Sequence, residues 1–230
     1  MRVLDVGSGA GDCAFAVAEL VGASGEVVGT DRVTAAVATA AKRAEAKGLR
    51  NVSFRAGDPA ELTFAAPFDA VVGRYVLWCQ ADPAAMLAKL ARQVRPGGIV
   101  AFHEMDWYGT RSSPVAPTYD RCCQWLREVF RATESDVNMA SRLYPAFVAA
   151  GLPAPSLRMR AFLGGAAESR EFLVGLAELL VSLAATLERL GIATAAEVGV
   201  ETLADRLQRE VTELDCAIIG RAEIGAWSRV

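Results

Sequence analysis

The sequence predicts an α/β fold built on a mostly parallel, doubly wound sheet. Apolar runs typical of buried strands alternate with helical patterns up to residue 108. This alternation favours parallel strands joined by crossover helices. The first strand, residues 3–6, ends in a glycine-rich turn that leads into a helical pattern over residues 14–20. From residue 109 onward the pattern is mainly one of amphipathic helices, so we expect a helical part added to the sheet.

The turn over residues 7–11, Gly-Ser-Gly-Ala-Gly, has the composition of a ligand-binding loop. Glycines let the backbone approach a ligand closely and leave amide groups exposed at a helix N-terminus. The turn departs from the dinucleotide fingerprint G-x-G-x-x-G because Asp12 occupies the position of the third glycine. A carboxylate there would compete with a pyrophosphate for the positive end of the helix dipole. We therefore expect a ligand without phosphates.

Four further motifs follow in order along the chain. A second predicted strand, residues 26–31, ends in Asp31, where a carboxylate would accept hydrogen bonds from ribose hydroxyls. A third ends in Gly57-Asp58. A fourth contains Phe-Asp-Ala-Val-Val at residues 68–72, and a fifth follows the turn Arg-Pro-Gly-Gly at residues 95–98.

Together these motifs resemble the class I S-adenosylmethionine (SAM)-dependent methyltransferases. They are most similar to the small-molecule branch related to the ubiquinone and menaquinone biosynthesis enzymes. The motifs span residues 3 to about 106, nearly half of the chain. The resemblance implies a Rossmann-like, seven-stranded sheet whose antiparallel last strand lies between strands five and six. It also implies SAM as the cofactor and S-adenosylhomocysteine (SAH) as the product.

The resemblance further implies which residues contact the cofactor. Asp31 would hold the ribose hydroxyls, and Arg32 would flank the adenine. Asp58 would accept a hydrogen bond from the adenine amino group. The full set implied is Asp5, Gly7, Ser8, Gly9, Gly11, Asp31, Arg32, Gly57, Asp58 and Arg74, with Asp5 near the amino group of SAM and Arg74 near its methionine part. The alternative is that these are the turn and cap residues of any α/β fold.

Residues after the fourth and fifth strands form the predicted substrate wall, because ligands of open α/β sheets bind outside the carboxyl ends of the strands. His103, the only histidine, and Glu104 are the candidate catalytic bases. Strand alternation sends these two side chains to opposite faces, so we expect only one of them to line the pocket. His103 could equally make a plain hydrogen bond at a strand end. The predicted substrate residues are Trp78, Asp106, Trp107 and Tyr108, with Cys79 and Gln80 beside Trp78.

Composition narrows the classes of partner. A net charge of −3 and a pI of about 5.4 argue against nucleic acid, and Gly-Arg-Tyr-Val at residues 73–76 stands where amino-directed nucleic-acid methyltransferases carry an Asn/Asp-Pro-Pro-Tyr motif. Five cysteines, two of them adjacent, do not suggest a disulfide framework. No secretory signal or membrane span is apparent. We expect a cytoplasmic protein with a small-molecule substrate, no metal, no nucleic-acid or membrane partner, and a homodimer as an open possibility.

The second half of the chain is expected to be mostly helical. We predict a core over residues 1–108, helical insertions forming a lid over 109–150 and 165–214, and closing strands over 151–164 and 215–230. Residues 217–220 and 224–227 are expected to form a hairpin-like segment. Because Met1-Arg2 leads straight into the first strand, we also expect that this start is a truncation or an internal start codon.

These observations predict a SAM-dependent methyltransferase that acts on a small apolar or aromatic metabolite, such as a natural product or a quinone-like compound. Whether oxygen, nitrogen or carbon accepts the methyl group is left open. Two alternatives are a SAM-binding, methyltransferase-like protein that catalyses a rearrangement or cyclisation, and a non-catalytic partner subunit with a broken pocket.

Overall fold

The computed structural model describes residues 1–230, and the chain divides into two compact units. Unit 1 comprises residues 1–104, 141–158 and 224–230, and unit 2 comprises residues 105–140 and 159–223. The chain passes between the units along three strands, each of which begins in one unit and ends in the other. These strands are β5 (Val94–Asp106), β7 (Ser156–Gly164) and β8 (Ala217–Arg229).

Unit 1 is built on a parallel sheet. Strand β1 (Arg2–Val6) pairs with β2 (Glu26–Asp31) on one side and with β4 (Phe68–Arg74) on the other. Strand β3 (Val52–Ala56) pairs with β2, and β5 pairs with β4, so the order is β3-β2-β1-β4-β5. All of these pairs are parallel, which confirms the predicted doubly wound sheet.

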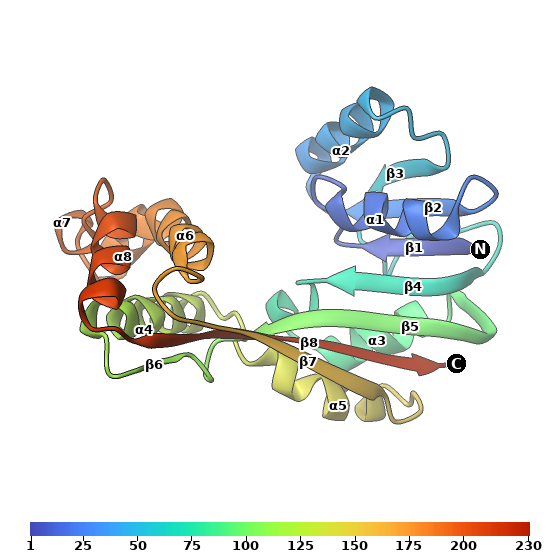
Figure 1. Ribbon diagram of the computed structural model, residues 1–230. Coiled ribbons are helices and arrows are strands. Elements are labelled where there is room, and N and C mark those ends of the chain that lie inside the picture. The colour runs from blue at the N-terminus through green and yellow to red at the C-terminus, as the bar shows by residue number, and fades with distance from the viewer. The chain divides into compact units, whose positions relative to one another are not determined.

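The last strand runs against the others. In the strand order β8 follows β5, and it also pairs with β6 and with β7. The Val230 amide donates to the Gly98 carbonyl (3.0 Å), and the Gly97 amide donates to the Val230 carbonyl (2.7 Å). In Figure 1 the arrowhead of β8 points opposite to those of β1 and β4. The predicted antiparallel last strand between the fifth strand and the next one is therefore confirmed.

Two predictions about the strands are wrong. Residues 217–227, expected as a hairpin-like segment, lie within the single strand β8. A hairpin would need a turn at residues 221–223, but this Arg-Ala-Glu stretch has no turn-forming residue and stays extended. The sheet also has eight strands instead of seven, because β6 (Arg111–Ser113) pairs antiparallel with the first residues of β8.

Four α-helices belong wholly or mostly to unit 1. They are α1 (Asp12–Val21), α2 (Thr34–Ala46), α3 (Pro83–Ala91) and most of α5 (Met139–Ala149), with a short 3₁₀ helix at Leu77–Cys79. Pro83 stands in the first turn of α3, and the Asp82 carboxylate caps it by accepting from the Ala85 amide (2.9 Å). Leu4, Val71 and Leu87 are fully buried in the core of the unit.

Unit 2 is a cluster of helices: α4 (Pro117–Ala132), α6 (Arg170–Arg189), α7 (Ala195–Val198) and α8 (Leu203–Glu213). Helices α4, α6 and α8 contact one another. Leucines along one face of α6 are buried, namely Leu173, Leu176, Leu180 and Leu187. Helix α7 begins with a capping box, since Thr194 accepts from the Glu197 amide and Glu197 accepts from the Thr194 amide.

Helix α4 buries the adjacent pair Cys122 and Cys123, and all five cysteines of the chain are free thiols. The pair therefore belongs to the core of unit 2, as predicted. Helix α6 is 20 residues long. Neither it nor any other helix of the chain combines the length and the apolar character needed to cross a membrane.

Candidate functional site

The glycine turn joins β1 to α1, as predicted. Gly7, Gly9 and Gly11 have φ angles of 65°, 51° and 95°, which L side chains rarely adopt. A Cβ atom at Gly7 would lie 2.6 Å from Cγ2 of Val76, whereas one at Gly9 would meet nothing within 4 Å. Gly7 is thus packed against the segment that follows β4, while the backbone at Gly9 faces open space.

Asp31, at the end of β2, holds this turn in place. Its Oδ2 accepts a hydrogen bond from the Gly9 amide (2.9 Å), and its Oδ1 accepts one from the Val33 amide (2.8 Å). Each carboxylate oxygen has a second lone pair that a ligand hydroxyl could use. Asp31 therefore presents a fixed acceptor beside the glycine turn, where the sequence predicts a ribose site.

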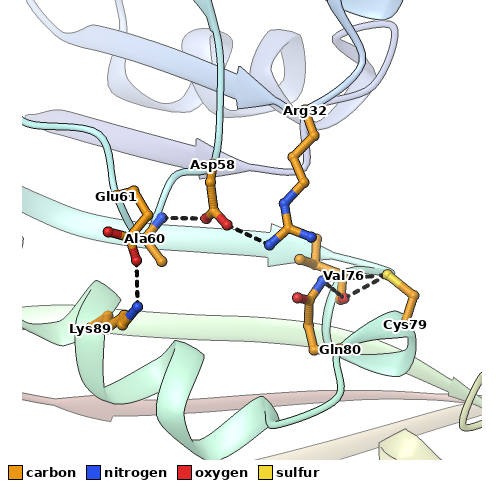
Figure 2. A network of polar contacts seen from close by, with 8 residues as sticks. All are labelled: Arg32, Asp58, Ala60, Glu61, Val76, Cys79, Gln80 and Lys89. Atoms are coloured by element: carbon orange, nitrogen blue, oxygen red, sulfur yellow. Dashed lines mark hydrogen bonds and ion pairs between the residues drawn. The ribbon is translucent and has the colours of Figure 1, made fainter.

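Arg32 and Asp58, both predicted cofactor contacts, are brought together from different loops. The Arg32 guanidinium lies 2.5 Å from Asp58 Oδ2, and Oδ1 of Asp58 accepts from the Ala60 amide (2.9 Å). Figure 2 shows Arg32 extending from the loop after β2 to Asp58 in the loop after β3. The pair joins the two loops that follow these neighbouring strands.

These loops border a cavity of about 190 Å³ in unit 1. It is lined by Val6, Gly7, Asp31, Arg32, Pro59, Tyr75, Val76, Cys79, Gln80 and Met86. Gly7, Asp31 and Arg32 come from the predicted cofactor set, and Cys79 and Gln80 from the predicted substrate wall. Sequence reasoning missed Val6, Pro59, Tyr75, Val76 and Met86 as lining residues. The signal for Pro59, Tyr75 and Val76 was their place just after the third and fourth strands.

The remaining predicted cofactor residues do not line this cavity. Gly9, Gly11 and Gly57 have positive φ angles, Arg74 is the exposed last residue of β4, and the Ser8 side chain is buried next to Gly29. The Arg74 guanidinium lies over the Tyr75 ring, 4.7 Å from its centroid. Arg74 thus contacts a lining residue, and its own contact with a ligand stays a prediction.

Asp5 is buried inside unit 1 with no exposed surface. Burial raises the pKa of this carboxyl to about 7, because a charged carboxylate is poorly solvated there. The nearby Cys13 thiol and Ala14 amide lower the pKa in part, although neither forms a well-aligned hydrogen bond with the carboxylate. The predicted contact of Asp5 with the amino group of SAM stays a prediction.

Glu104, at the end of β5, holds the segment that lines the cavity. Its side chain has no exposed surface, and Oε1 accepts from the amides of Val76 (2.9 Å) and Leu77 (2.7 Å). These amides open the 3₁₀ helix over Leu77–Cys79. The geometry therefore gives Glu104 a positioning role, since it fixes the backbone after β4.

His103 contacts the same segment from the preceding position of β5. Its carbonyl accepts from the Tyr75 amide (2.9 Å), and its ring centroid lies 5.7 Å from that of Tyr75. The Trp78 indole donates to the Tyr75 carbonyl (2.7 Å). Tyr75 itself has a left-handed φ of 57°. The two candidate bases and one predicted substrate residue thus converge on the turn after β4.

The other predicted substrate residues belong to unit 2. The Asp106 carboxylate accepts from the Tyr108 amide (2.7 Å), and the Tyr108 side chain is exposed. Trp107 is buried and lines a different cavity, described below. No group of three or more His, Cys, Asp or Glu side chains in residues 1–230 is arranged to hold a metal ion.

The fold and this arrangement of loops define the class of protein. Residues 1–151 match the family described as a methyltransferase domain, and the chain belongs to that family. Its parallel sheet, antiparallel last strand and glycine turn are those of the Rossmann-like methyltransferase fold.

Individual relatives share part of the chain. Over 102 residues the chain is 40% identical to the aklanonic acid methyltransferase of Streptomyces sp. strain C5, covering 44% of this chain and 46% of that protein. Over 106 residues it is 36% identical to the 2-phytyl-1,4-naphthoquinone methyltransferase of Synechococcus elongatus, covering 45% and 46%. The matches thus span about half the length of these curated relatives.

A solved structure confirms the fold. The 4+2 cyclase SpnF aligns with a TM-score of 0.55 at 22% identity, and the alignment covers 100% of this chain and 75% of that chain. At this level of identity the likeness concerns the fold alone.

Proposed function

We propose that the protein is a SAM-dependent methyltransferase that transfers a methyl group to a small apolar or aromatic metabolite. Membership of the methyltransferase family supports this proposal. The observation that carries it is the Asp31 carboxylate, which two backbone amides hold beside the glycine turn and the cavity of unit 1. The curated relatives that act on aklanonic acid and on a naphthoquinone support a small-molecule substrate.

The residues present fit the nucleoside part of SAM. Asp31 offers acceptors for the ribose hydroxyls, and the Arg32–Asp58 pair would flank the adenine. The open space at Gly9 lets a ligand lie against the backbone. Asp12, in the first turn of α1, disfavours phosphate there, and SAM carries none. When bound, SAM supplies an electrophilic methyl group.

The chain itself would contribute orientation and a proton acceptor. Holding two reactants in line can lower a barrier by several kcal/mol (~7 or more for the best-oriented pairs). We assign Glu104 to positioning, because it fixes the turn that carries Tyr75 and Val76. We assign His103 as the base that removes the proton from a hydroxyl group that receives the methyl group. The His103 ring, on β5, lies beside the ring of Tyr75 in the turn after β4.

The same proposal includes the setting of the protein. Five free cysteines support a reducing compartment such as the cytoplasm. The pI of about 5.4 supports a small-molecule substrate over nucleic acid. A homodimer stays a prediction.

Calorimetric titration of the chain with SAM and with SAH tests the cofactor site. We expect micromolar binding that falls at least about 100-fold in Asp31→Ala, because the ribose loses its acceptors and the glycine turn loses its anchor. Asp12→Ala is the matched control, since this carboxylate is exposed and pairs with Arg43 on the surface. Absence of binding to the unsubstituted chain, or equal binding to Asp31→Ala, would overturn the proposal.

Methyl transfer must then be separated from the two alternatives. A rearrangement or cyclisation would use bound SAM without consuming it, and a non-catalytic subunit would do neither. Conversion of SAM to SAH in the presence of an aromatic acceptor, followed by mass spectrometry, shows transfer. If the chain binds SAM and converts the acceptor into a rearranged or cyclised product while no SAH forms, the rearrangement or cyclisation alternative is favoured.

A further inference from the structure

Unit 2 contains a larger cavity that the cofactor site does not use. Its volume is about 530 Å³, which lies within the range of roughly 300–1,000 Å³ typical of small-molecule sites. Its walls come from β7, α6, β8 and the residue after β5. They are formed by Trp107, Arg160, Ala161, Phe162, Glu171, Phe172, Gly175, Leu176, Leu179, Arg221 and Glu223.

Aromatic rings form much of this wall. The rings of Phe162 and Phe172 stack at a centroid distance of 5.0 Å and an interplanar angle of 4°. The Trp107 side chain is 1% exposed, and the Arg221 guanidinium lies 5.4 Å from its ring centroid. Flat apolar surfaces of this kind favour a flat, conjugated ligand, which can stack on the rings or meet their edges.

Gly175 keeps the cavity open. It lies inside α6, where glycine is less favourable than alanine for helix formation. A Cβ atom built at Gly175 meets nothing within 4 Å, so no neighbour excludes a side chain there. A larger residue at this position would enter the cavity. The missing side chain therefore enlarges the cavity at a cost to the helix.

Among the charged side chains that line the cavity, Arg160 is the cation that can bind an anionic ligand group. Arg221 and Glu223 pair with each other at 2.6 Å. Glu171 stands in the first turn of α6, where a negative charge complements the helix dipole. Arg160, on β7, is exposed at the cavity and takes part in none of the ion pairs of the chain. A guanidinium in this position suits a carboxylate or a similar anionic oxygen.

We propose that this cavity binds a flat, conjugated small molecule that carries a carboxylate or another anionic oxygen. Arg160 contacts the anion, and Phe162 and Phe172 contact the rings. The identification of this ligand as the methyl acceptor rests on the proposed function, whereas the binding itself does not.

Two ligands that share one ring system test the cavity: anthraquinone-2-carboxylate, which is an anion, and anthraquinone-2-carboxamide, which is neutral. Both are titrated into the full chain by calorimetry, and SAM is titrated separately. We expect the carboxylate to bind with micromolar affinity, and Gly175→Leu to weaken both probes at least tenfold by filling the cavity. Arg160→Gln should weaken the carboxylate at least fivefold and the carboxamide less than twofold. Arg170→Gln, an exposed arginine on α6 outside the cavity, is the charge-matched control and should change neither.

The variants are checked for folding by their thermal transitions. Gly175→Leu replaces glycine with a better helix former, so its Tm should not fall. If it fails to fold, the exposed Arg160→Gln variant still decides the question. No binding of the carboxylate to the unsubstituted chain, unchanged binding to a folded Gly175→Leu variant, or equal weakening of both probes by Arg160→Gln overturns the proposal. If the unsubstituted chain binds the carboxylate probe but does not bind SAM, the proposed function is contradicted and the cavity proposal is not.

Discussion

The two units place their binding features in different kinds of structure. In unit 1 the cavity is bordered by loops at the ends of strands, and its polar groups include the Asp31 carboxylate, which the Gly9 amide holds in place. In unit 2 the cavity lies on the faces of a helix and two strands, and its walls are side chains such as Phe162 and Phe172. Loop geometry demands particular residue types, so the loops around the cavity of unit 1 can be recognised as a sequence motif. The apolar side chains around the cavity of unit 2 resemble those of any hydrophobic core, so no sequence motif marks that cavity.

The units also differ in where they contain locally unfavourable residues or conformations. Unit 1 contains three left-handed glycines in one turn and a buried carboxyl at Asp5. Unit 2 has well-buried leucine stripes, and its departure is the helical Gly175. Functional sites commonly keep such local conflicts, and the rest of the fold offsets them. Three pairs of substitutions test this comparison, in order of expected effect.

The largest expected effect is the pH dependence produced by Asp5. Its pKa is about 7 in the folded chain and 3.8 in the reference state, so the folded state binds the proton more tightly. The resulting stabilisation is fully present below about pH 4 and is lost as the pH rises through 7. The shift corresponds to about 4 kcal/mol. Asp5→Asn should therefore remove most of this decline in chemical denaturation measured from pH 4 to pH 8.

Asp69 is the matched control for Asp5. Hydrogen bonds from the Arg2 amide and the Arg95 side chain lower its pKa, so its stabilisation is present above about pH 4 and is lost at more acid pH. Asp69→Asn should leave the decline between pH 4 and pH 8 in place. An Asp5→Asn variant with the same pH profile as the unsubstituted chain would contradict the buried carboxyl.

A cavity in the core of unit 2 should have the next largest effect. Leu180 is fully buried on α6, and Leu180→Ala should lower the free energy of unfolding by about 3 kcal/mol. SAM affinity of the folded variant should change less than twofold, because the proposed cofactor site lies in unit 1. Val181→Ala, at the neighbouring exposed position, should lower the unfolding free energy by less than about 0.5 kcal/mol. A parallel loss of SAM affinity in Leu180→Ala would show that the two units do not act separately.

The smallest expected effects separate two glycines of the same turn. Gly7→Ala combines left-handed strain with a clash against Val76 and should cost about 2–3 kcal/mol in urea denaturation. Gly9→Ala has only the strain and should cost about 1 kcal/mol. Its methyl group would occupy the open space at the turn, so SAM affinity should fall more than stability does. Equal destabilisation by both substitutions would contradict the packing described for Gly7.

Much of unit 1 could be predicted from sequence, because its elements are built from local signals. The strand that ends in Asp31 and the glycine turn after β1 each follow from residues a few positions apart. The prediction of a hairpin near the C-terminus was wrong because local signals do not determine how long a strand is. The stretch has strand-forming residues, but its extension through residues 221–223 depends on pairing with strands far away in the chain.

The sequence by itself determined the alternation of strands and helices in unit 1, the glycine turn and the carboxylate at residue 31, since each depends on local conformation and spacing. Only the tertiary structure decided what surrounds them. Glu104 reaches Val76 across 28 positions of sequence, and this contact holds the segment after β4 beside the cavity of unit 1. The cavity of unit 2 likewise joins Trp107 to residues more than 50 positions away. Such contacts arise from the packing of whole elements, and a short stretch of sequence carries no signal for them.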